Sequence, residues 1–254
     1  MNDIENERNL KNAIELGHDQ ALNDQKGNDV FLLGDIHGDF TAIYKWLNTF
    51  CKKGDSLIQL GDFGAGMISV EKIEELAFAA KQMGVKIYVL RGNHDNPEYF
   101  NLSVKVNDSL EFVPDYTVKK INGLNYLFLG GAISIDRKKR KEGFDYWKAE
   151  GFVYHPNQLL KYYKNIDVVV SHTAPEEVRP FYGMGPHPDL VNYQKEDVSL
   201  EKDLKEEKDL ITKAFDIVKP NLWAFGHFHQ YHNTEINGTK FVCLGIDHLE
   251  MILL

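Results

Sequence analysis

The sequence predicts an α/β protein, because short apolar runs and helical patterns alternate along its first half. Three apolar runs, VFLLG, SLIQLG and KIYVLRG, are separated by two segments whose apolar residues recur at helical spacing. Strand, helix, strand, helix, strand is the pattern of a parallel sheet with right-handed crossovers. The second half places Asn-Gly pairs between strand-like runs, which is typical of tight hairpins. Parallel and antiparallel pairing are therefore both expected.

Two helices are expected between the first three strands. The first has an apolar stripe formed by Ile43, Trp46, Leu47 and Phe50. The second is expected to end at Gly84, since glycine suits the left-handed residue after a helix. Its stripe consists of Val70, Ile73, Leu76, Ala77, Ala80 and Met83.

The second half contains two hairpin turns, at Asn122-Gly123 and Asn237-Gly238. Between them, DVVVSH and LWAFGHFH are interpreted as two further buried strands. The charged stretch 195–218 is expected to be a helix with a solvated Lys/Glu face, closed by Pro220. Its apolar stripe consists of Leu200, Leu204, Ile211, Phe215 and Val218.

Residues 1–28 are charged and weakly amphipathic, so we expect an N-terminal extension followed by a single domain over 29–254. A short helix is expected in this extension, around Leu10, Ile14 and Leu16.

Composition narrows the classes of function. The chain has 254 residues, of which 43% are hydrophobic and 26% charged, as expected of a globular protein with a substantial core. Its formal net charge of -9 disfavours nucleic acid as the main partner, because phosphate neutralisation needs clustered Lys and Arg. No stretch approaches the roughly 18 uncharged residues of a membrane span, so no membrane partner is expected. The oligomeric state stays open.

Cysteine usage predicts a reducing compartment. Cys51 and Cys243 cannot form a disulfide framework and show no C-x-x-C spacing. Both are interpreted as small buried apolar residues. We therefore expect a cytoplasmic protein.

Polar side chains follow five of the predicted strands directly. In an open α/β sheet, ligands bind outside the carboxyl ends of the strands, so five such loops can converge on one crevice. Glycines before most of these positions let the backbone bend sharply. The residues concerned are Asp35, His37, Asp62, Asn93, His94, His172, His227 and His229.

This set predicts a metal site. Without His94 it contains two carboxylates, one carboxamide oxygen and four imidazoles, an N/O mixture that suits Mn, Fe, Zn or Co better than Ca or Mg. Seven ligands are too many for one ion. They suit two divalent ions that share a bridging carboxylate and leave positions open for water and substrate. Manganese is our first choice.

Single fragments support other families less well. His94-Asp95 resembles the pair of His-Asp phosphohydrolases, but there the pair lies on a helix and here it follows a strand and a glycine. The DIH fragment resembles the nucleophile loop of haloacid-dehalogenase enzymes, but His37 stands where their second Asp is expected. The order of all the blocks decides between these alternatives.

Together, GDIHG, GDFGAG, GNHD, SHTAP and GHFH resemble the calcineurin-like metallophosphoesterase superfamily, in its bacterial and phage-type branch, over about residues 30 to 250. The resemblance implies a four-layer α/β/β/α sandwich with two mixed β-sheets and a dinuclear site at its edge. It implies a hydrolase of phosphate esters, carried by small molecules or peptides, in which a hydroxide bridging the two ions attacks phosphorus.

The resemblance also assigns roles to individual residues. The first ion would be bound by Asp35, His37, Asp62 and His229. The second would be bound by Asp62, Asn93, His172 and His227. Asp62 would bridge the ions, and Asn93 would also lie beside the substrate. His94 would be free of metal and would act as general acid or as hydrogen-bond donor to the phosphoryl group. Asp95 is expected to be a cap or an ion-pair partner.

The second block departs from the best-known branch. Protein Ser/Thr phosphatases and the lambda phage phosphatase read G-D-x-x-D-R-G there, whereas Ala65 and Gly66 replace that Asp and Arg in this chain. The Asp that orients the His and one phosphate-binding Arg are missing, which argues against protein phosphatase activity. Arg137 or Arg140 could supply a replacement cation. For Arg137, binding of substrate and a place in a solvated loop are held as equal alternatives.

Two other functions are weighed against phosphomonoester hydrolysis. A nuclease or cyclic-nucleotide phosphodiesterase would use the same site. A non-catalytic binding module on this fold is disfavoured, because such modules usually lose ligands or the His, and this chain has all eight residues.

Overall fold

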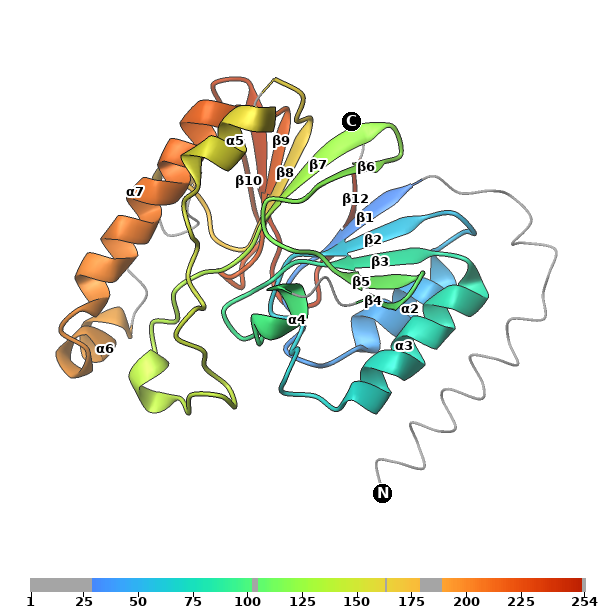
Figure 1. The fold of residues 1–254 in the computed structure, drawn as a ribbon, viewed down its shortest axis with the longest axis horizontal. Coiled ribbons are helices and arrows are strands. Elements are labelled where there is room, and N and C mark those ends of the chain that lie inside the picture. Colours follow the sequence, from blue (N-terminus) through green and yellow to red (C-terminus); the bar gives the residue numbers. More distant parts are fainter. Residues whose placement is uncertain (1–28, 102–104, 163, 179–188, 253–254) are drawn as a thin grey trace.

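The computed structural model describes residues 29–101, 105–162, 164–178 and 189–252. Within these ranges the chain forms two six-stranded sheets packed face to face, with helices on both outer sides (Figure 1). The expected four-layer α/β/β/α sandwich with two mixed sheets is confirmed. The helix expected around Leu10, Ile14 and Leu16 lies outside the described residues. No helix within the described ranges is long and apolar enough to cross a membrane.

The first sheet contains the three strands predicted from the N-terminal half. Its order is β12-β1-β2-β3-β5-β4. The four central strands run parallel, and β12 and β4 pair antiparallel at the edges. The strands are β1 (Val30–Leu33), β2 (Ser56–Gln59), β3 (Lys86–Val89), β4 (Lys105–Asn107), β5 (Leu110–Phe112) and β12 (Leu249–Met251).

The second sheet is built the same way, from the C-terminal half. Its order is β10-β11-β9-β8-β7-β6, with four parallel central strands and an antiparallel hairpin at each edge. Both predicted Asn-Gly turns are confirmed, since Asn122-Gly123 joins β6 to β7 and Asn237-Gly238 joins β10 to β11 with positive φ at all four residues. The strands are β6 (Val118–Ile121), β7 (Leu124–Leu129), β8 (Val168–Ser171), β9 (Leu222–Phe225), β10 (His232–Ile236) and β11 (Thr239–Cys243).

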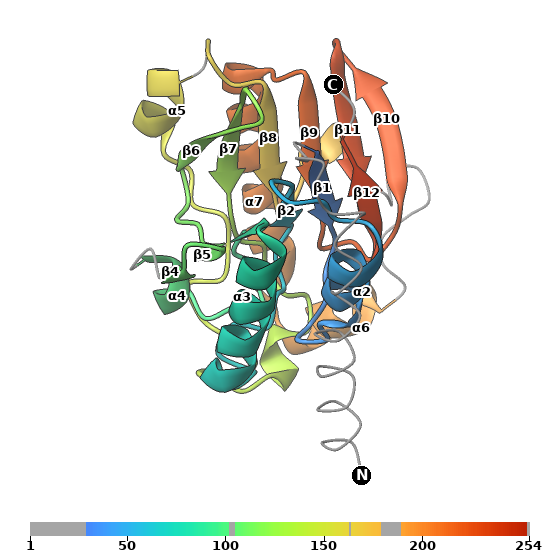
Figure 2. The ribbon, with the colours of Figure 1, turned by 90° about the vertical axis from the view of Figure 1, so that its right-hand side faces the viewer.

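Two helices cover the first sheet, as predicted (Figure 2). These are α2 (Thr41–Thr49) and α3 (Val70–Met83). Ser69 caps the start of α3 by accepting the amide of Lys72, and Gly84 ends it with a left-handed φ of 67°. The predicted stripes are too long at their ends, because Phe50 follows the last turn of α2 and Val70 opens α3, and both side chains are exposed.

Helices α5 (Pro156–Tyr162) and α7 (Leu200–Val218) cover the outer face of the second sheet. Helix α7 ends before Lys219, which adopts the left-handed conformation and is followed by Pro220. The stretch expected to be one helix from about 195 is divided, because α6 (Leu190–Glu196) ends before α7 begins. The short helix α4 (Glu98–Asn101) follows β3.

Alternating side chains on the strands create three apolar layers. Phe31 and Leu33 of β1 pack outward against Trp46 and its neighbours, whereas Val30 and Leu32 pack inward against the second sheet. On the far side, a third cluster lies between the second sheet and helices α5 and α7. In the middle layer, the large side chains of Tyr126 and Phe128 pack between the two sheets.

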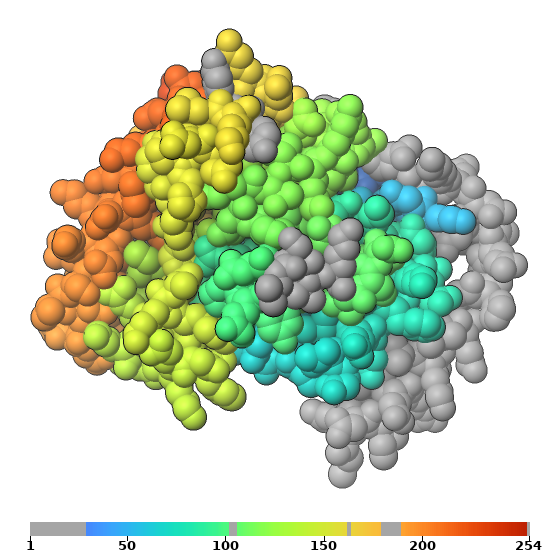
Figure 3. Space-filling model, in the orientation of Figure 1, coloured from blue at the N-terminus to red at the C-terminus, as the bar shows by residue number. Residues whose placement is uncertain are grey.

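The connection from β7 to α5 is a long segment, residues 130–155, with a 3₁₀ turn at Arg137–Lys139. It lies at the surface between the orange helix α7 and the blue-green half of the molecule (Figure 3). The backbone carbonyl of its Asp145 contacts the ring of His94. The segment therefore borders the loops that follow the strands of the first sheet.

Candidate metal centre

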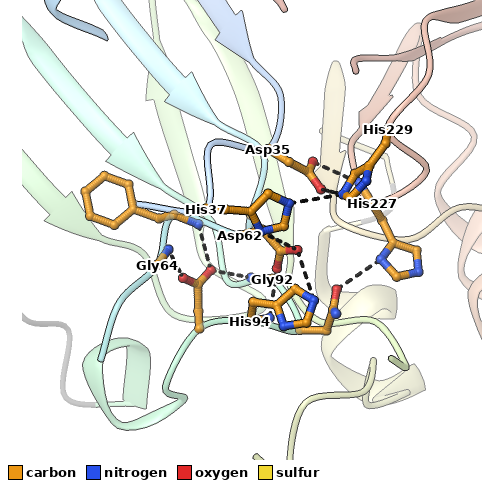
Figure 4. A network of polar contacts seen from close by, with 12 residues as sticks. Asp35, His37, Asp62, Gly64, Gly92, His94, His227 and His229 are labelled. Atoms are coloured by element: carbon orange, nitrogen blue, oxygen red, sulfur yellow. Dashed lines mark hydrogen bonds and ion pairs between the residues drawn. The ribbon is translucent and has the colours of Figure 1, made fainter. Parts of the chain in front are cut away.

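The predicted polar side chains meet at the edge shared by the two sheets (Figure 4). Asp35, Asp62 and Asn93 follow β1, β2 and β3 of the first sheet. The imidazoles come mainly from the second sheet, where His172 follows β8 and His227 and His229 follow β9. Strands separated by more than a hundred residues thus contribute to one site, as their position at the carboxyl ends predicted.

The first group of ligands is compact. Asp35, His37, Asp62 and His229 each offer one atom, and these four atoms lie within 4.8 Å of one another. Two ligands on opposite sides of one divalent ion are separated by roughly 4 Å, given metal–ligand distances near 2.0 to 2.2 Å. The Nε2 atoms of His37 and His229 are 3.1 Å apart. The donor types and their spacing fit a divalent metal ion.

Asp35 supports this fit. Its Oδ1 accepts the backbone amide of His227 at 3.0 Å. Its Oδ2 is buried and accepts no hydrogen bond within the described part of the chain, although Nε2 of His229 lies 3.1 Å away. A buried carboxylate oxygen is costly without a partner, so a cation between these two atoms would satisfy both.

Asp62 lies at the centre of the site. Its Oδ1 accepts the backbone amide of His94 at 2.8 Å and lies 3.2 Å from Nε2 of His172, while its Oδ2 is 3.8 Å from Nδ1 of His37. Burial disfavours the charged form, but His172 and His94 hold the pKa of Asp62 well below its usual range. Asp62 is thus a fully buried carboxylate that lies between two groups of imidazoles.

The second group surrounds the amide oxygen of Asn93. This Oδ1 lies 2.9 Å from Nε2 of His172 and 3.0 Å from Nδ1 of His227. The rings of the two histidines are in edge contact, with centroids 5.1 Å apart. The three predicted ligands of the second position therefore do converge, with Asp62 beside them.

One ring nitrogen of His172 faces only oxygen atoms. Its Nδ1 lies 2.7 Å from the carbonyl oxygen of Leu60, so this nitrogen carries the proton. Nε2 then faces two oxygens, those of Asn93 and Asp62. Such a nitrogen needs a second proton or a cation. Burial opposes protonation, but the charge of Asp62 outweighs it and raises the pKa of His172 to about 9. A metal ion can take the place of that proton.

The backbone is strained where these side chains are presented. Positive φ angles occur at His37 (45°), Asp62 (57°), His227 (68°) and His229 (54°). This conformation is unfavourable for residues with a Cβ atom, and it persists at functional sites where surrounding contacts enforce it. Gly92 has a related function, since a Cβ there would collide with the backbone and carboxylate of Asp62.

Asp95 is the cap that the sequence suggested. Its carboxylate accepts the backbone amides of Phe63, Gly64, Ala65 and Gly92, at 2.7 to 3.2 Å. It joins the loop after β2 to the loop after β3. Asp95 therefore fixes the two loops that present Asp62 and Asn93, and it does not face the metal positions.

His94 lies beside Asp62 and is buried, with 7% of its surface exposed. Its Nδ1 is 3.3 Å from the carbonyl oxygen of Asp145, and its Nε2 is 4.0 Å from Oδ2 of Asp62. The orienting Asp of the protein phosphatases is replaced by Ala65. In this chain a backbone carbonyl of the 130–155 segment contacts the ring instead.

Arg137 is bound by acidic residues of the helical region. Its guanidinium donates to Asp197 and Asp203, both at 2.6 Å, and to Ser199 at 2.9 Å. Desolvation opposes the charged form, but these carboxylates raise the pKa of Arg137 further. Arg140 pairs with Asp136. These contacts anchor the segment, and phosphate binding by Arg137 stays a prediction.

Three residues near the site were missed by sequence reasoning. Ser134 accepts the amide NH₂ of Asn93, Glu150 accepts the hydroxyl of Ser134, and the carbonyl of Asp145 contacts His94. All three lie in the irregular segment 130–155. No motif marks them, because their contacts depend on how this segment folds back.

The fold and the ligand cluster agree with one protein family. Residues 29–231 match the model of the calcineurin-like phosphoesterase family, which covers most of the sequence. The chain therefore belongs to the calcineurin-like phosphoesterases, and it has the acidic and histidine cluster of a metal-dependent member. No curated protein sequence is detectably similar to it.

Two solved structures are similar to this chain at low sequence identity. The protein TT1561 of Thermus thermophilus superposes with a TM-score of 0.54 and 12% identity, covering 88% of this chain and 97% of that protein. The phosphopantetheinyl hydrolase of Mycobacterium tuberculosis gives a TM-score of 0.46 and 13% identity, covering 89% and 97%. The first of these similarities supports the fold.

Proposed function

We propose that this chain hydrolyses phosphate esters, using two divalent metal ions at the edge between its sheets. The observation that carries the proposal is the convergence of two ligand groups on opposite sides of one buried carboxylate, Asp62. A single ion would bind only one of the two ligand groups. In the other group, the lone pairs of the ligand atoms would face each other with no cation between them.

The residues divide between two positions. Asp35, His37 and His229 would hold the first ion, and Asn93, His172 and His227 the second, with Asp62 shared. Mn²⁺ is the expected ion, and Fe, Zn or Co suit the same donors. Two such ions supply Lewis acidity toward phosphoryl oxygens and make water a nucleophile at neutral pH.

The protein supplies orientation and a proton. Nε2 of His94 lies 4.0 Å from Oδ2 of Asp62 and is free of the proposed ligand set, so the imidazolium form of His94 can donate its Nε2 proton to a phosphoryl oxygen or to the departing oxygen. The carbonyl of Asp145 fixes the other ring nitrogen. Asp95 fixes the loops beneath. These contacts hold the donor and the proposed ligands in one fixed arrangement, which lowers the cost of reaching the transition state.

We expect the substrate to be a small or peptide-borne phosphate monoester. A diester, as in a nuclease or cyclic-nucleotide phosphodiesterase, is the alternative for the same residues. The test therefore includes substrates of both classes.

The test combines metal analysis with a substrate panel. Metal-free protein reloaded with Mn²⁺ should hold two ions per chain by elemental analysis and should hydrolyse at least one monoester, diester or dinucleotide. Asp62→Asn should lower occupancy at both positions, because the shared ligand loses its charge.

Asp55→Asn is the matched control for this substitution. Asp55 is an equally buried carboxylate at the opposite end of β2, where it accepts the amides of Asp29 and Lys52. The Asp55→Asn protein should bind both ions. One tightly bound ion with no second in excess metal would refute the two-ion proposal, and an inactive two-ion protein would refute the enzymatic one.

A further inference from the structure

A chain of three buried hydrogen bonds lies behind Asn93, on the side away from the histidines. The amide NH₂ of Asn93 donates to Oγ of Ser134 at 2.8 Å. The Ser134 hydroxyl donates to Oε2 of Glu150 at 2.6 Å, and the Ser134 backbone amide donates to Oε1 at 2.9 Å. The three residues are only 2%, 2% and 3% exposed. None of these contacts belongs to the ligand set.

The direction of these hydrogen bonds determines which end of the Asn93 carboxamide faces the proposed metal ion. A carboxamide has an oxygen that can bind a cation and an NH₂ that cannot. Glu150 accepts the hydroxyl proton of Ser134, so the lone pairs of that hydroxyl point toward Asn93. The NH₂ must then turn to Ser134, and the oxygen is left facing His172 and His227.

The position of Glu150 is itself fixed. Arg91, two residues before Asn93, donates to the backbone carbonyls of Ala149, Glu150 and Gly151 and pairs with Asp115 at 2.8 Å. The carbonyl of Glu150 also accepts the amide of Ala132. The strand end that presents Asn93 and the segment that presents Glu150 are thus joined by one buried guanidinium.

We infer that Ser134 and Glu150 are positioning residues for the second metal position: they hold the oxygen of Asn93 toward it and thereby set its affinity for a divalent ion. The inference rests on the proposed function, since it needs an ion at that position. Contacts of this kind orient a ligand without touching the metal, and their loss commonly lowers metal affinity about 10- to 100-fold.

Two substitutions test this chain of contacts. Ser134→Ala removes the acceptor, so the Asn93 amide can turn its NH₂ toward the metal. Glu150→Gln keeps the shape but offers one acceptor where two are used, so it cannot accept both the amide and the hydroxyl of Ser134. The matched control is Thr239→Val, which removes a buried hydroxyl that donates to the carbonyl of Pro220 at the far end of β11.

Metal affinity is measured by calorimetric titration of Mn²⁺ into metal-free protein, at about pH 8 so that carboxyl groups are ionised. Ser134→Ala and Glu150→Gln should each weaken one of two ions about 10- to 100-fold and leave the other unchanged. Thr239→Val should bind both ions as the unmodified protein does. Anomalous diffraction from Mn²⁺-soaked crystals should show the loss at the position beside His172 and His227.

A double substitution separates positioning from general destabilisation. Asn93→Asp presents an oxygen at either end of its side chain, so its orientation no longer matters. In that background, adding Ser134→Ala should cost no metal affinity. Unchanged affinity in both single variants, or an equal loss in the Asn93→Asp background, would overturn the inference. An unmodified protein that binds fewer than two ions would overturn the proposed function instead.

Discussion

The two halves of the candidate site differ in how their ligands are held. On the side of Asp35, the side chains of His37 and His229 are 31% and 45% exposed, and their Nε2 atoms face each other. On the side of Asn93, His172 is fully buried and its Nδ1 is fixed by a backbone carbonyl. The first half is the more open one, and the second is organised by contacts with the backbone.

The pKa shifts of the histidines do not divide along the same line, because they differ within the open half. Burial lowers the pKa of His37, against the opposing charges of Asp62 and Asp35. The pKa of His172 is raised despite burial, because it contacts Asp62 directly. The pKa of His229 is also raised, chiefly by its contact with Asp35. Burial alone therefore does not set the direction of the shift; direct contact with a carboxylate does. The open half is where we expect substrate to enter.

The largest expected effect concerns His94, whose ring lies 5.5 Å from that of His37 in the open half. If it protonates the leaving oxygen, His94→Asn should slow hydrolysis of an alkyl phosphate on the order of 10²- to 10⁴-fold. An aryl phosphate such as p-nitrophenyl phosphate expels a stable anion and should slow far less. Steady-state rates on both esters, with metal content measured alongside, check this.

The pattern of rates separates the alternatives for His94. Equal slowing of both esters, with metals retained, would mean that His94 binds the phosphoryl group and donates no proton to the leaving oxygen. If neither ester slows, His94 has no part in the reaction and the open half is not where the chemistry occurs.

The stability of metal-free protein tests the contrast between halves directly. His172→Ala leaves the buried carboxylate of Asp62 without its closest imidazole, which should cost on the order of 3 kcal/mol in the free energy of unfolding. His229→Ala removes a partly exposed partner of Asp35, and water can replace it, so we expect a cost of about 1 kcal/mol or less. Urea unfolding in the presence of chelator measures both. Equal costs would mean that the halves are organised alike.

Much of this site was predictable from sequence because each ligand directly follows a strand. The strand ends specify an edge of the sheet, and apolar runs with flanking glycines locate strand ends well. Asp35, Asp62, Asn93 and His172 were found in this way, as were the two Asn-Gly hairpins. The edge strands β4 and β12 and the neighbouring strand β5 were missed, since three residues are too few to show alternation.

The contacts that support the ligands were not predictable. Ser134 and Glu150 lie sixteen residues apart in an irregular segment. The contact between Arg91 and this segment spans about sixty residues. Such contacts form when a loop packs on the folded sheet. Neither the periodicity of apolar residues nor the spacing of motifs predicts them. The partners of Arg137 were not predictable either. The sequence left substrate binding and a solvated loop as equal alternatives, and in the structure its guanidinium pairs with two carboxylates.

The last expected effect is a pH dependence of stability from Glu150, which belongs to the organised half. Burial raises the pKa of Glu150 from 4.5 to about 7, with Glu207 adding to the shift and Ser134 and Arg137 opposing it. Between these two pKa values the folded protein retains a proton that the unfolded chain has released. Stability from this group is therefore complete below about pH 4.5 and falls as the pH rises to about 7.

Glu150→Gln isolates this contribution, because Gln does not titrate. The difference in unfolding free energy between Glu150→Gln and the unmodified protein, both free of metal, should grow in favour of the variant by up to about 3 kcal/mol between pH 4.5 and 7. Other carboxyl groups titrate in both proteins and cancel in the difference. A difference that stays flat with pH would mean that Glu150 has the same pKa in the folded and the unfolded protein. Holding the ionised carboxylate of Glu150 beside Ser134 would then not lower the free energy of unfolding near neutral pH.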